Sequence, residues 1–464
     1  MRRLLVLGLD SVPPAFVFDR YLDRMPNLKR MLARSAYGTL RTTDPPITVP
    51  AWAVMFSGVD PGTLGIYGFR HRQAGSYSTV YTPTSKMVSY PCVWDLLSRE
   101  GRRVAVIGMP PGYPPPAVNG VYISDILTPE SAADFVSPAS LVPEVRAAAG
   151  GEYQFDVTFR SDDRERVERE IFEMTRRRFA VARHLWAKER WDFFAIHEIG
   201  PDRIHHAFWK YFDRAHPAYV GGSPFNSTAE RYYAFLDAEI GKLLESVPDD
   251  VLVWIASDHG SKAMDGCFCI NEWLVQTGFL VLQGPRPVRG TPLEEVEVDW
   301  SRTRVWGAGG YYARLFFNLR GREPKGIVDP ADVPALIRAL GTGLEALVRP
   351  DGKPLGVELL EPSKIYREVT GDAPDLMAYF GNLNWRSAGT VGHDSLFLAE
   401  NDTGPDDSVH SMDGFFILYD PLDLRPGRRL PEQSILDVAP TLLKRLGVPL
   451  PPHLQGRPIS ELLD

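Results

Sequence analysis

Acidic residues follow three apolar, strand-like segments of this chain. The first segment, LLVLGLD, ends at Asp10; the second, DFFAIHEIGPD, leads to Asp202; the third, VLVWIASDHG, contains Asp258 and His259. Ligands of an open α/β sheet gather at the carboxyl ends of its parallel strands, so this pattern predicts a metal-binding rim. Asp202 and His206 stand four residues apart and would share one face of a helix. Carboxylates combined with imidazoles suit Zn²⁺ at an open, catalytic site.

Each of these acids also has an ordinary structural interpretation. An Asp after a strand is often a helix N-cap, and Asp-His-Gly can be a plain turn. The combination favours metal binding, because a globular domain seldom ends three core strands in acids and also places His206 and His259 beside two of them.

Thr48 is the candidate nucleophile. It lies just before Val49 and Pro50 at the start of a predicted helix, where the positive end of the helix dipole attracts phosphate. A threonine attacks phosphorus only if a metal or a base lowers the cost of forming its alkoxide. The alternative, that Thr48 only caps this helix, stays open at this point.

The elements that would position these residues alternate along the chain. Besides the three segments above, RRVAVIGMP and VNGVYISDI predict strands, and helices are predicted from Pro26, over 162–190 and from Thr228. This βαβ rhythm predicts an α/β fold with a mostly parallel sheet sandwiched by helices.

The rhythm weakens in the second half of the chain, although apolar and aromatic residues remain frequent there. A segment of this composition is not disordered, so we predict an inserted, smaller cap subdomain over the rim. The predicted division is a catalytic core of residues 1–266 and 391–464 and a substrate-selecting cap of residues 267–390.

Composition excludes several classes of protein. The chain has 464 residues and a net charge of −8, which argues against a dedicated nucleic-acid-binding protein. No stretch approaches the ~20 apolar residues of a transmembrane helix. The apolar run after Arg2 and Arg3 is too short for a signal peptide, and the three cysteines form no disulfide framework. We therefore expect a cytoplasmic protein without a membrane partner.

Six motifs in order along the chain resemble the alkaline-phosphatase superfamily, most closely its type I phosphodiesterase and nucleotide-pyrophosphatase branch. The motifs are Asp10 at the first strand end, Thr48-Val-Pro followed by SGVDPGTLGIYGF, the Asp202 and His206 pair, Ser257-Asp258-His259-Gly260, His410 in HSMDGFFIL, and the closing DVAPTLL.

The resemblance implies an alkaline-phosphatase-like fold and a hydrolase of small phosphate esters, most closely a phosphodiesterase or nucleotide pyrophosphatase with a nucleotide-like substrate. It also implies two divalent metal ions, Zn²⁺ by preference, with Mn or Fe as alternatives. Thr48 would attack and form a phospho-threonine intermediate, which water then releases. One ion would be held by Asp202, His206 and His410, and the other by Asp10, Asp258, His259 and the Thr48 oxygen.

The chain departs from the nucleotide-pyrophosphatase pattern at two positions. Leu64 replaces a histidine, and Phe69 stands where the pattern has an asparagine that holds a phosphoryl oxygen. Arg70, His71 or Arg72 could substitute for this asparagine, because a guanidinium binds phosphate oxygens in bidentate fashion.

Further residues are candidates for substrate contacts. His205 and His393 are lesser candidates, with surface or core positions as the alternative. In the predicted cap, aromatic residues near an arginine suit the stacking of a base or ring, although they could equally form the core of that subdomain. These cap residues are Trp273, Trp306, Tyr311, Tyr312 and Arg314.

The motifs also bear on several alternative functions. A sulfatase is disfavoured, because that branch starts its motif with Cys or Ser rather than Thr48. A phosphoglycerate-mutase-like enzyme resembles RLFFNLRGREPKGIV and SMDG but uses a serine nucleophile and usually manganese. Phosphomonoester and phosphonate hydrolysis fit the same scaffold. A non-catalytic metal-binding protein requires an idle Thr48 hydroxyl.

Overall fold

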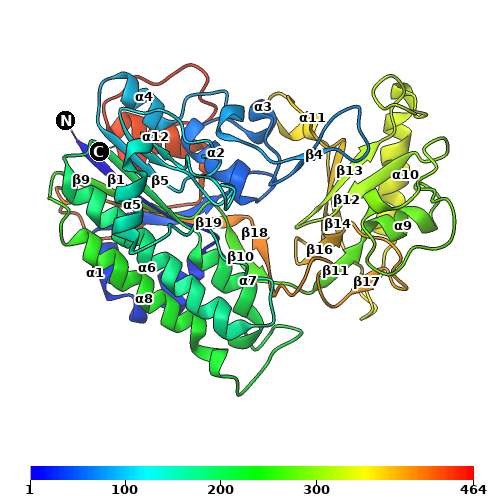
Figure 1. Ribbon diagram of the computed structural model, residues 1–464, viewed down its shortest axis with the longest axis horizontal. Helices are drawn as coiled ribbons and strands as arrows, with labels where there is room; N and C mark the ends of the chain where they lie inside the picture. The colour runs from blue at the N-terminus through cyan, green and yellow to red at the C-terminus, as the bar shows by residue number, and fades with distance from the viewer. Residues whose placement is uncertain (1, 464) are drawn as a thin grey trace.

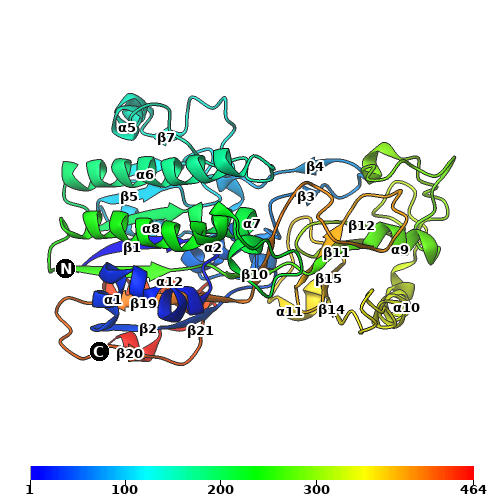
Figure 2. The same cartoon turned by 90° about the horizontal axis from the view of Figure 1, so that it is seen from below.

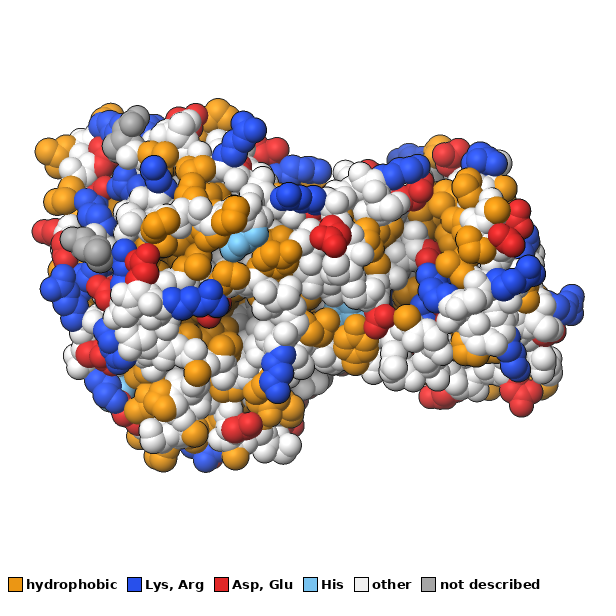
Figure 3. Space-filling view, turned by 90° about the horizontal axis from the view of Figure 1, so that it is seen from above, with side chains coloured by type: hydrophobic (Ala, Val, Ile, Leu, Met, Phe, Trp, Pro, Cys, Tyr) orange, Lys and Arg blue, Asp and Glu red, His pale blue; other side chains and the backbone are white. Residues whose placement is uncertain are grey.

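The structure, a computed structural model, describes residues 2–463 and has two lobes (Figure 1). The larger lobe contains a ten-stranded sheet and the smaller lobe a seven-stranded sheet. The space-filling view shows the two lobes meeting at a narrower waist (Figure 3). Among the described residues, no helix combines the length and apolar character needed to cross a membrane.

The centre of the large sheet is parallel. Strand β1 lies between β9 and β8, and β8 continues to β5 and β6, all parallel to their neighbours. The order across the sheet is β20 (Arg428–Arg429), β2 (Ser35–Arg41), β19 (Asp413–Tyr419), β9 (Val251–Ala256), β1 (Arg3–Leu9), β8 (Phe193–Glu198), β5 (Val104–Ile107), β6 (Gly120–Ile123) and β7 (Val136–Ser137), with β21 (Gln433–Ser434) also paired to β2. The predicted fold class is confirmed.

Helices cover both faces of this sheet (Figure 1), and the view from below shows one of the two layers in front of it (Figure 2). Leu5 and Leu7 of β1 pack into the core formed with one helical layer, whereas Leu4 and Val6 pack into the core on the opposite face. A strand buried on both faces must be apolar throughout, which is why β1 reads as a continuous hydrophobic run. The first layer contains α1 (Pro26–Leu32), α6 (Arg164–Lys188), α7 (Gly200–Phe212) and α8 (Thr228–Leu244); the second contains α2 (Thr48–Ser57), α4 (Val93–Arg99) and α12 (Val438–Arg445).

The smaller lobe has its own sheet and core. Its strands are, in spatial order, β12 (Val305–Ala308), β13 (Ala313–Phe317), β15 (Leu376–Phe380), β16 (Trp385–Ala388), β11 (Gly266–Cys269) and β17 (Phe397–Leu398), with β14 (Val357–Leu360) paired to β15. Helices α9 (Ile270–Gln276) and α10 (Val333–Glu345) pack on it. This sheet spans 266–398, whereas the predicted insertion ends at residue 390.

Two connections between the lobes matter for the site. Strands β10 (Gly260–Ala263) and β18 (Ser408–Ser411) form an antiparallel pair between the two sheets, in which Ser261 stands opposite His410 (Figure 1). The hairpin of β3 (His71–Arg72) and β4 (Val80–Tyr81) leaves the large lobe and contacts the small one, where Tyr77 stacks on Trp300 at 3.6 Å between ring centroids.

Candidate active site

Neighbouring strand ends bring the predicted acids together. Asp10 directly follows β1, and Asp258 and His259 follow its parallel neighbour β9. Asp202 lies in the first turn of α7, just after β8 on the other side of β1. Because the three strands are adjacent and parallel, their carboxyl ends form one rim, as the sequence pattern predicts.

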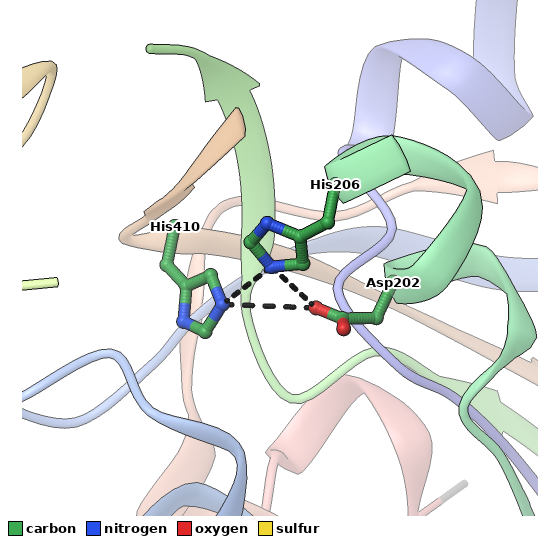
Figure 4. A group of neighbouring side chains, drawn as sticks. All are labelled: Asp202, His206 and His410. Carbon is green, nitrogen blue, oxygen red and sulfur yellow. Dashed lines mark hydrogen bonds and ion pairs between the residues drawn. The ribbon is translucent and has the colours of Figure 1, made fainter. Parts of the chain in front are cut away.

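Asp202, His206 and His410 form the first group of side chains at this rim (Figure 4). The Asp202 Oδ1 atom lies 3.2 Å from His206 Nε2 and 3.6 Å from His410 Nε2. The two Nε2 atoms are 3.3 Å apart. All three side chains are buried, so these atoms face one another rather than solvent.

Asp10, Asp258 and His259 form the second group, and Thr48 joins it. His259 Nε2 lies 3.3 Å from Asp258 Oδ2 and 3.8 Å from Asp10 Oδ1. Thr48 Oγ1 lies 3.3 Å from His259 Nε2 and 3.4 Å from Asp10 Oδ1. The N-cap of α2 is Ile47, and no side chain caps this helix. The Thr48 hydroxyl therefore faces the acidic group instead of capping the helix.

Hydrogen bonds to carbonyl oxygens determine which nitrogens of two rings carry a proton. His410 Nδ1 lies 2.7 Å from the Pro46 carbonyl oxygen, and His259 Nδ1 lies 3.1 Å from that of Gly260. A carbonyl oxygen only accepts, so each Nδ1 donates and the Nε2 of the neutral ring keeps a lone pair. Both rings thus direct a metal-binding lone pair into the rim.

The donor set fits two divalent cations. Asp202 Oδ1 and Asp258 Oδ2 are buried and have no hydrogen-bond partner, although carboxylate oxygens are normally satisfied when buried. These oxygens face imidazole nitrogens at about 3.2–3.3 Å. Electron-rich atoms gathered at this spacing are stabilised by a cation between them, and mixed nitrogen and oxygen ligands suit Zn²⁺.

Burial affects the protonation of side chains in both groups. Burial and the neighbouring Asp10 carboxylate raise the pKa of Asp258 well above its usual value. Burial also lowers the pKa of His259, and burial together with His259 lowers the pKa of His410 well below 6.5. The two rings are therefore neutral near pH 7, the form in which imidazole binds metals.

Asp10 is held by residues that the sequence reasoning missed. Trp52 Nε1 donates to Asp10 Oδ2, and His197 Nε2 contacts the same oxygen, both at 2.8 Å. These bonds leave Oδ1 free to face Thr48. His197 lies within the buried strand β8, whose sequence FFAIHE predicts a strand of the protein core. The one signal is a histidine inside that otherwise apolar run.

Asp406 supports the first group and was also missed. Its Oδ1 lies 2.6 Å from His206 Nδ1, and its Oδ2 accepts from Arg386 at 2.6 Å and from Arg160 at 3.1 Å. Burial opposes a charge on His206, but Asp406, Tyr311 and Asp202 outweigh it and raise the pKa of His206 well above 6.5. A metal ion must displace that proton. The signal in the sequence is an Asp-Asp pair four residues before His410.

Two of the predicted substrate-contacting residues, Tyr311 and Arg70, line a cavity beside the rim. The Tyr311 ring stacks on His410 with 3.8 Å between centroids, and its hydroxyl lies 3.2 Å from His206 Nε2. This cavity has a volume of about 550 Å³. Phe69, which stands where the family pattern has asparagine, lines the same cavity.

The structure does not bring Arg72, Trp306 or His205 to this cavity. Arg72 is buried in an ion pair with Glu323 at 3.1 Å, and its guanidinium lies over the Trp306 ring, so both serve the smaller lobe's packing. His205 is buried against Ser261 and Tyr233. Burial lowers the pKa of His205 to about 3.

Three further candidates for substrate contacts also lie away from this cavity. His71 accepts a hydrogen bond from the Tyr67 backbone, and burial lowers the pKa of its ring to about 4. His393 contacts the Thr390 hydroxyl. Trp273 packs in the core of the smaller lobe.

Comparison with known proteins identifies the family. Residues 4–413 match the family of type I phosphodiesterases and nucleotide pyrophosphatases. The chain belongs to this family. It is accordingly an enzyme, a metal-dependent phosphoester hydrolase, as the motifs imply. No curated protein matches the chain in a sequence search.

Solved structures share its fold at low sequence identity. Human ectonucleotide pyrophosphatase/phosphodiesterase 5 is 13% identical over 100% of both chains, with a TM-score of 0.57. Its murine counterpart, solved as an inactive variant in complex with AMP, gives the same values. Phosphonoacetate hydrolase from Sinorhizobium meliloti, in complex with phosphonoformate, is 18% identical over 94% of both chains, with a TM-score of 0.59.

Proposed function

We propose that this enzyme is a two-metal phosphodiesterase or nucleotide pyrophosphatase that acts through a phospho-threonine intermediate on Thr48. The observation that carries the proposal is the position of the Thr48 hydroxyl, 3.3 Å from His259 Nε2 and 3.4 Å from Asp10 Oδ1. A threonine that was idle, as in a non-catalytic metal-binding protein, would have no reason to lie among metal-binding side chains.

The two groups of side chains would each hold one ion, zinc by preference. Asp202, His206 and His410 supply one carboxylate and two imidazoles, and the second group supplies Asp10, Asp258, His259 and the Thr48 oxygen. When bound, the ions supply positive charge that stabilises an alkoxide and neutralises phosphoryl oxygens.

The residues around Thr48 would then have separate roles in the reaction. Thr48 Oγ1 forms a bond to phosphorus while the bond to the leaving oxygen breaks, and water later breaks the Oγ1–P bond and restores the hydroxyl. Thr48 is the first residue of α2, so free backbone N–H groups of that helix end lie beside the incoming phosphate. The fixed positions of Asp10 and His259 keep the hydroxyl oriented.

Phosphonate or phosphomonoester hydrolysis is the second candidate. The observation in its favour is the arginine-rich lining of the cavity beside the rim, which suits a small, strongly anionic substrate. The Sinorhizobium structure, a phosphonoacetate hydrolase, has the same fold. The AMP in the murine structure supports the nucleotide-like alternative.

The test combines metal content with substrates and one variant. We expect close to two equivalents of metal by elemental analysis and loss of turnover with a chelator. Bis-p-nitrophenyl phosphate, p-nitrophenyl phosphate and a dinucleotide would rank diesterase against monoesterase activity. Thr48→Ala should lower turnover by several orders of magnitude while metal stays bound, and Thr48→Ser should retain part of it.

Thr441→Ala is the matched control, because Thr441 is a buried threonine of α12 whose hydroxyl donates to the Asp437 carbonyl oxygen, and it belongs to neither group of metal-binding side chains. It should leave kcat unchanged. Near wild-type turnover in metal-loaded Thr48→Ala would instead mean that water attacks phosphorus directly, and the phospho-threonine would be abandoned.

A further inference from the structure

The cavity beside the rim contains five arginines contributed by both lobes. Its wall includes Tyr311, which stacks on His410, and Ile47, the residue before Thr48. Through these two residues the cavity borders the proposed metal site. A volume of about 550 Å³ is suited to a small molecule. The arginines are Arg70, Arg160, Arg203, Arg314 and Arg386.

Three of these arginines are balanced by carboxylates. Arg203 pairs with Asp156 at 2.6 Å and with Asp202 at 2.5 Å. Arg386 and Arg160 both pair with Asp406, at 2.6 and 3.0 Å. Each of these three guanidiniums thus already has a carboxylate partner and helps to fix the acids that surround the rim.

Arg70 and Arg314 have no carboxylate partner among the described residues. The Arg314 guanidinium donates to the backbone carbonyl of Arg70, and this is a neutral acceptor. Burial and the nearby Arg70 charge both lower the pKa of Arg314. Two neighbouring cations, one of them half-buried and without a carboxylate partner, repel each other, and an anion between them would relieve this repulsion.

The pair is also held in place. Tyr312, two residues before Arg314, donates its hydroxyl hydrogen to the Tyr67 carbonyl oxygen at 2.8 Å. Together with the bond from Arg314 to Arg70 O, this ties β13 to the segment 67–70 at two points. The cavity wall that carries the two cations is therefore preorganised, which reduces the entropic cost of binding a ligand.

The distance to the reacting centre suits one small substrate. Tyr311 lies against His410, and Arg314 is three residues further along the chain than Tyr311. The Cα atoms of Tyr311 and Arg314 are therefore at most about 10 Å apart. A phosphoryl group at the rim and a second anion at the arginine pair would then belong to the same molecule.

We propose that Arg70 and Arg314 bind a second anionic group of the substrate, a carboxylate or a phosphate, while the rim holds the phosphoryl group that is transferred. The substrate class is a small phosphate ester, pyrophosphate or phosphonate with a further negative charge at its other end. This inference rests on the proposed hydrolase site and adds the determinant of substrate choice.

Binding to metal-loaded Thr48→Ala protein, measured by isothermal titration calorimetry, tests the proposal without turnover. The probes are methylphosphonate, with one anionic group, and phosphonoacetate and methylenebisphosphonate, with two. We expect at least one of the two-anion probes to bind about tenfold or more tightly than methylphosphonate, since one charge-assisted contact suffices for that factor. The relative affinities for phosphonoacetate and methylenebisphosphonate then show whether the second anionic group is a carboxylate or a phosphate.

Arg70→Gln and Arg314→Gln, each made in this background, should remove the advantage, and Arg314→Lys should keep part of it. Arg338→Gln is the control, because Arg338 is an exposed residue of α10. Since Arg314 is unpaired, Arg314→Gln should leave the Tm of the ligand-free protein unchanged or raise it. Because Arg70 is exposed, Arg70→Gln should not affect folding and tests the proposal independently of Arg314→Gln.

Equal affinity for all three probes, or an advantage that survives both Gln variants, would overturn the proposal. A lower Tm in Arg314→Gln with the discrimination intact would assign Arg314 a structural role and overturn it as well. Failure of the hydrolase function is a separate result: wild-type protein would turn over no ester, while the arginine-dependent binding would persist.

Discussion

Replacement of Asp406 by asparagine tests how one carboxylate supports both a metal ligand and the fold. Asp406 is fully buried; one oxygen contacts His206 Nδ1 and the other accepts from Arg386, both at 2.6 Å. Asparagine keeps the shape of the side chain but removes its charge. Arg386, which is 3% exposed, would then lose the one carboxylate that it pairs with among residues 2–463.

The expected losses follow from these contacts. Removing one partner of a buried ion pair costs about 3–5 kcal/mol. Typical domains have a stability of about 5–15 kcal/mol, so the variant should still fold but unfold at a clearly lower urea concentration. The carboxylate also orients His206, and loss of such a partner typically weakens metal binding about 10–100-fold.

Two measurements separate these effects. Urea unfolding of the metal-free protein reports the ion pair, and competition with a chromophoric chelator reports metal affinity. Asp407→Asn is the control, because Asp407 pairs with Lys210 at 3.1 Å and does not contact a metal-binding ring. Unchanged metal affinity in Asp406→Asn, relative to this control, would refute the reasoning about His206.

Two further predictions concern Asp125 and Trp306. Burial raises the pKa of Asp125 from 3.8 to about 7, so the native state prefers the neutral acid and wild-type stability should fall by about 4 kcal/mol as the pH rises from 4 to 7. Asp125→Asn should lack this loss in urea unfolding, and parallel pH profiles would contradict the assignment. Trp306 is buried in the smaller lobe's core, so Trp306→Ala should cost about 3–5 kcal/mol and lower kcat/KM equally for aromatic and alkyl diesters. A selective loss on aromatic diesters would restore its role in substrate choice.

The strand ends that carry the site were predictable from the sequence. The runs ending at Asp10 and Asp258 are continuous and apolar because β1 and β9 are buried on both faces. Parallel strands place such ends on one rim, and Asp202 and His206 follow from helical spacing. The local pattern determines these positions, so the sequence is sufficient.

The supporting residues were not predictable, because their partners are distant along the chain. His197 contacts Asp10 across 187 residues, and His206 contacts Asp406 across 200. Nothing in the neighbourhood of His197 distinguishes it from an ordinary core histidine. A single sequence contains the acids and rings but not the tertiary contacts that pair them.

The roles of the arginines after Phe69 illustrate the same limit. Arg70 and Arg72 look equivalent in the sequence, yet Arg72 is buried against Glu323, 251 residues away, whereas Arg70 lines the cavity. The aromatic residues near Gly307 divide similarly: Trp306 packs into the smaller lobe and Tyr311 stacks on His410. Trp306 lies in β12 and Tyr311 in the connection between β12 and β13, so their different surroundings depend on how the second lobe's sheet packs, which the local sequence pattern does not reveal.

Two arginines that line the cavity differ in whether a carboxylate pairs with them, and this difference connects stability with substrate choice. Arg386 lies over the Tyr311 ring at 4.2 Å and is neutralised by Asp406, so its charge contributes to a fixed framework. Arg314 lines the same cavity without a carboxylate partner among the described residues. An unpaired, half-buried cation lowers the stability of the free enzyme, and a substrate anion that pairs with it recovers this free energy on binding. The fold thus provides a carboxylate where a cation must hold the site together and leaves it out where the substrate can supply the charge.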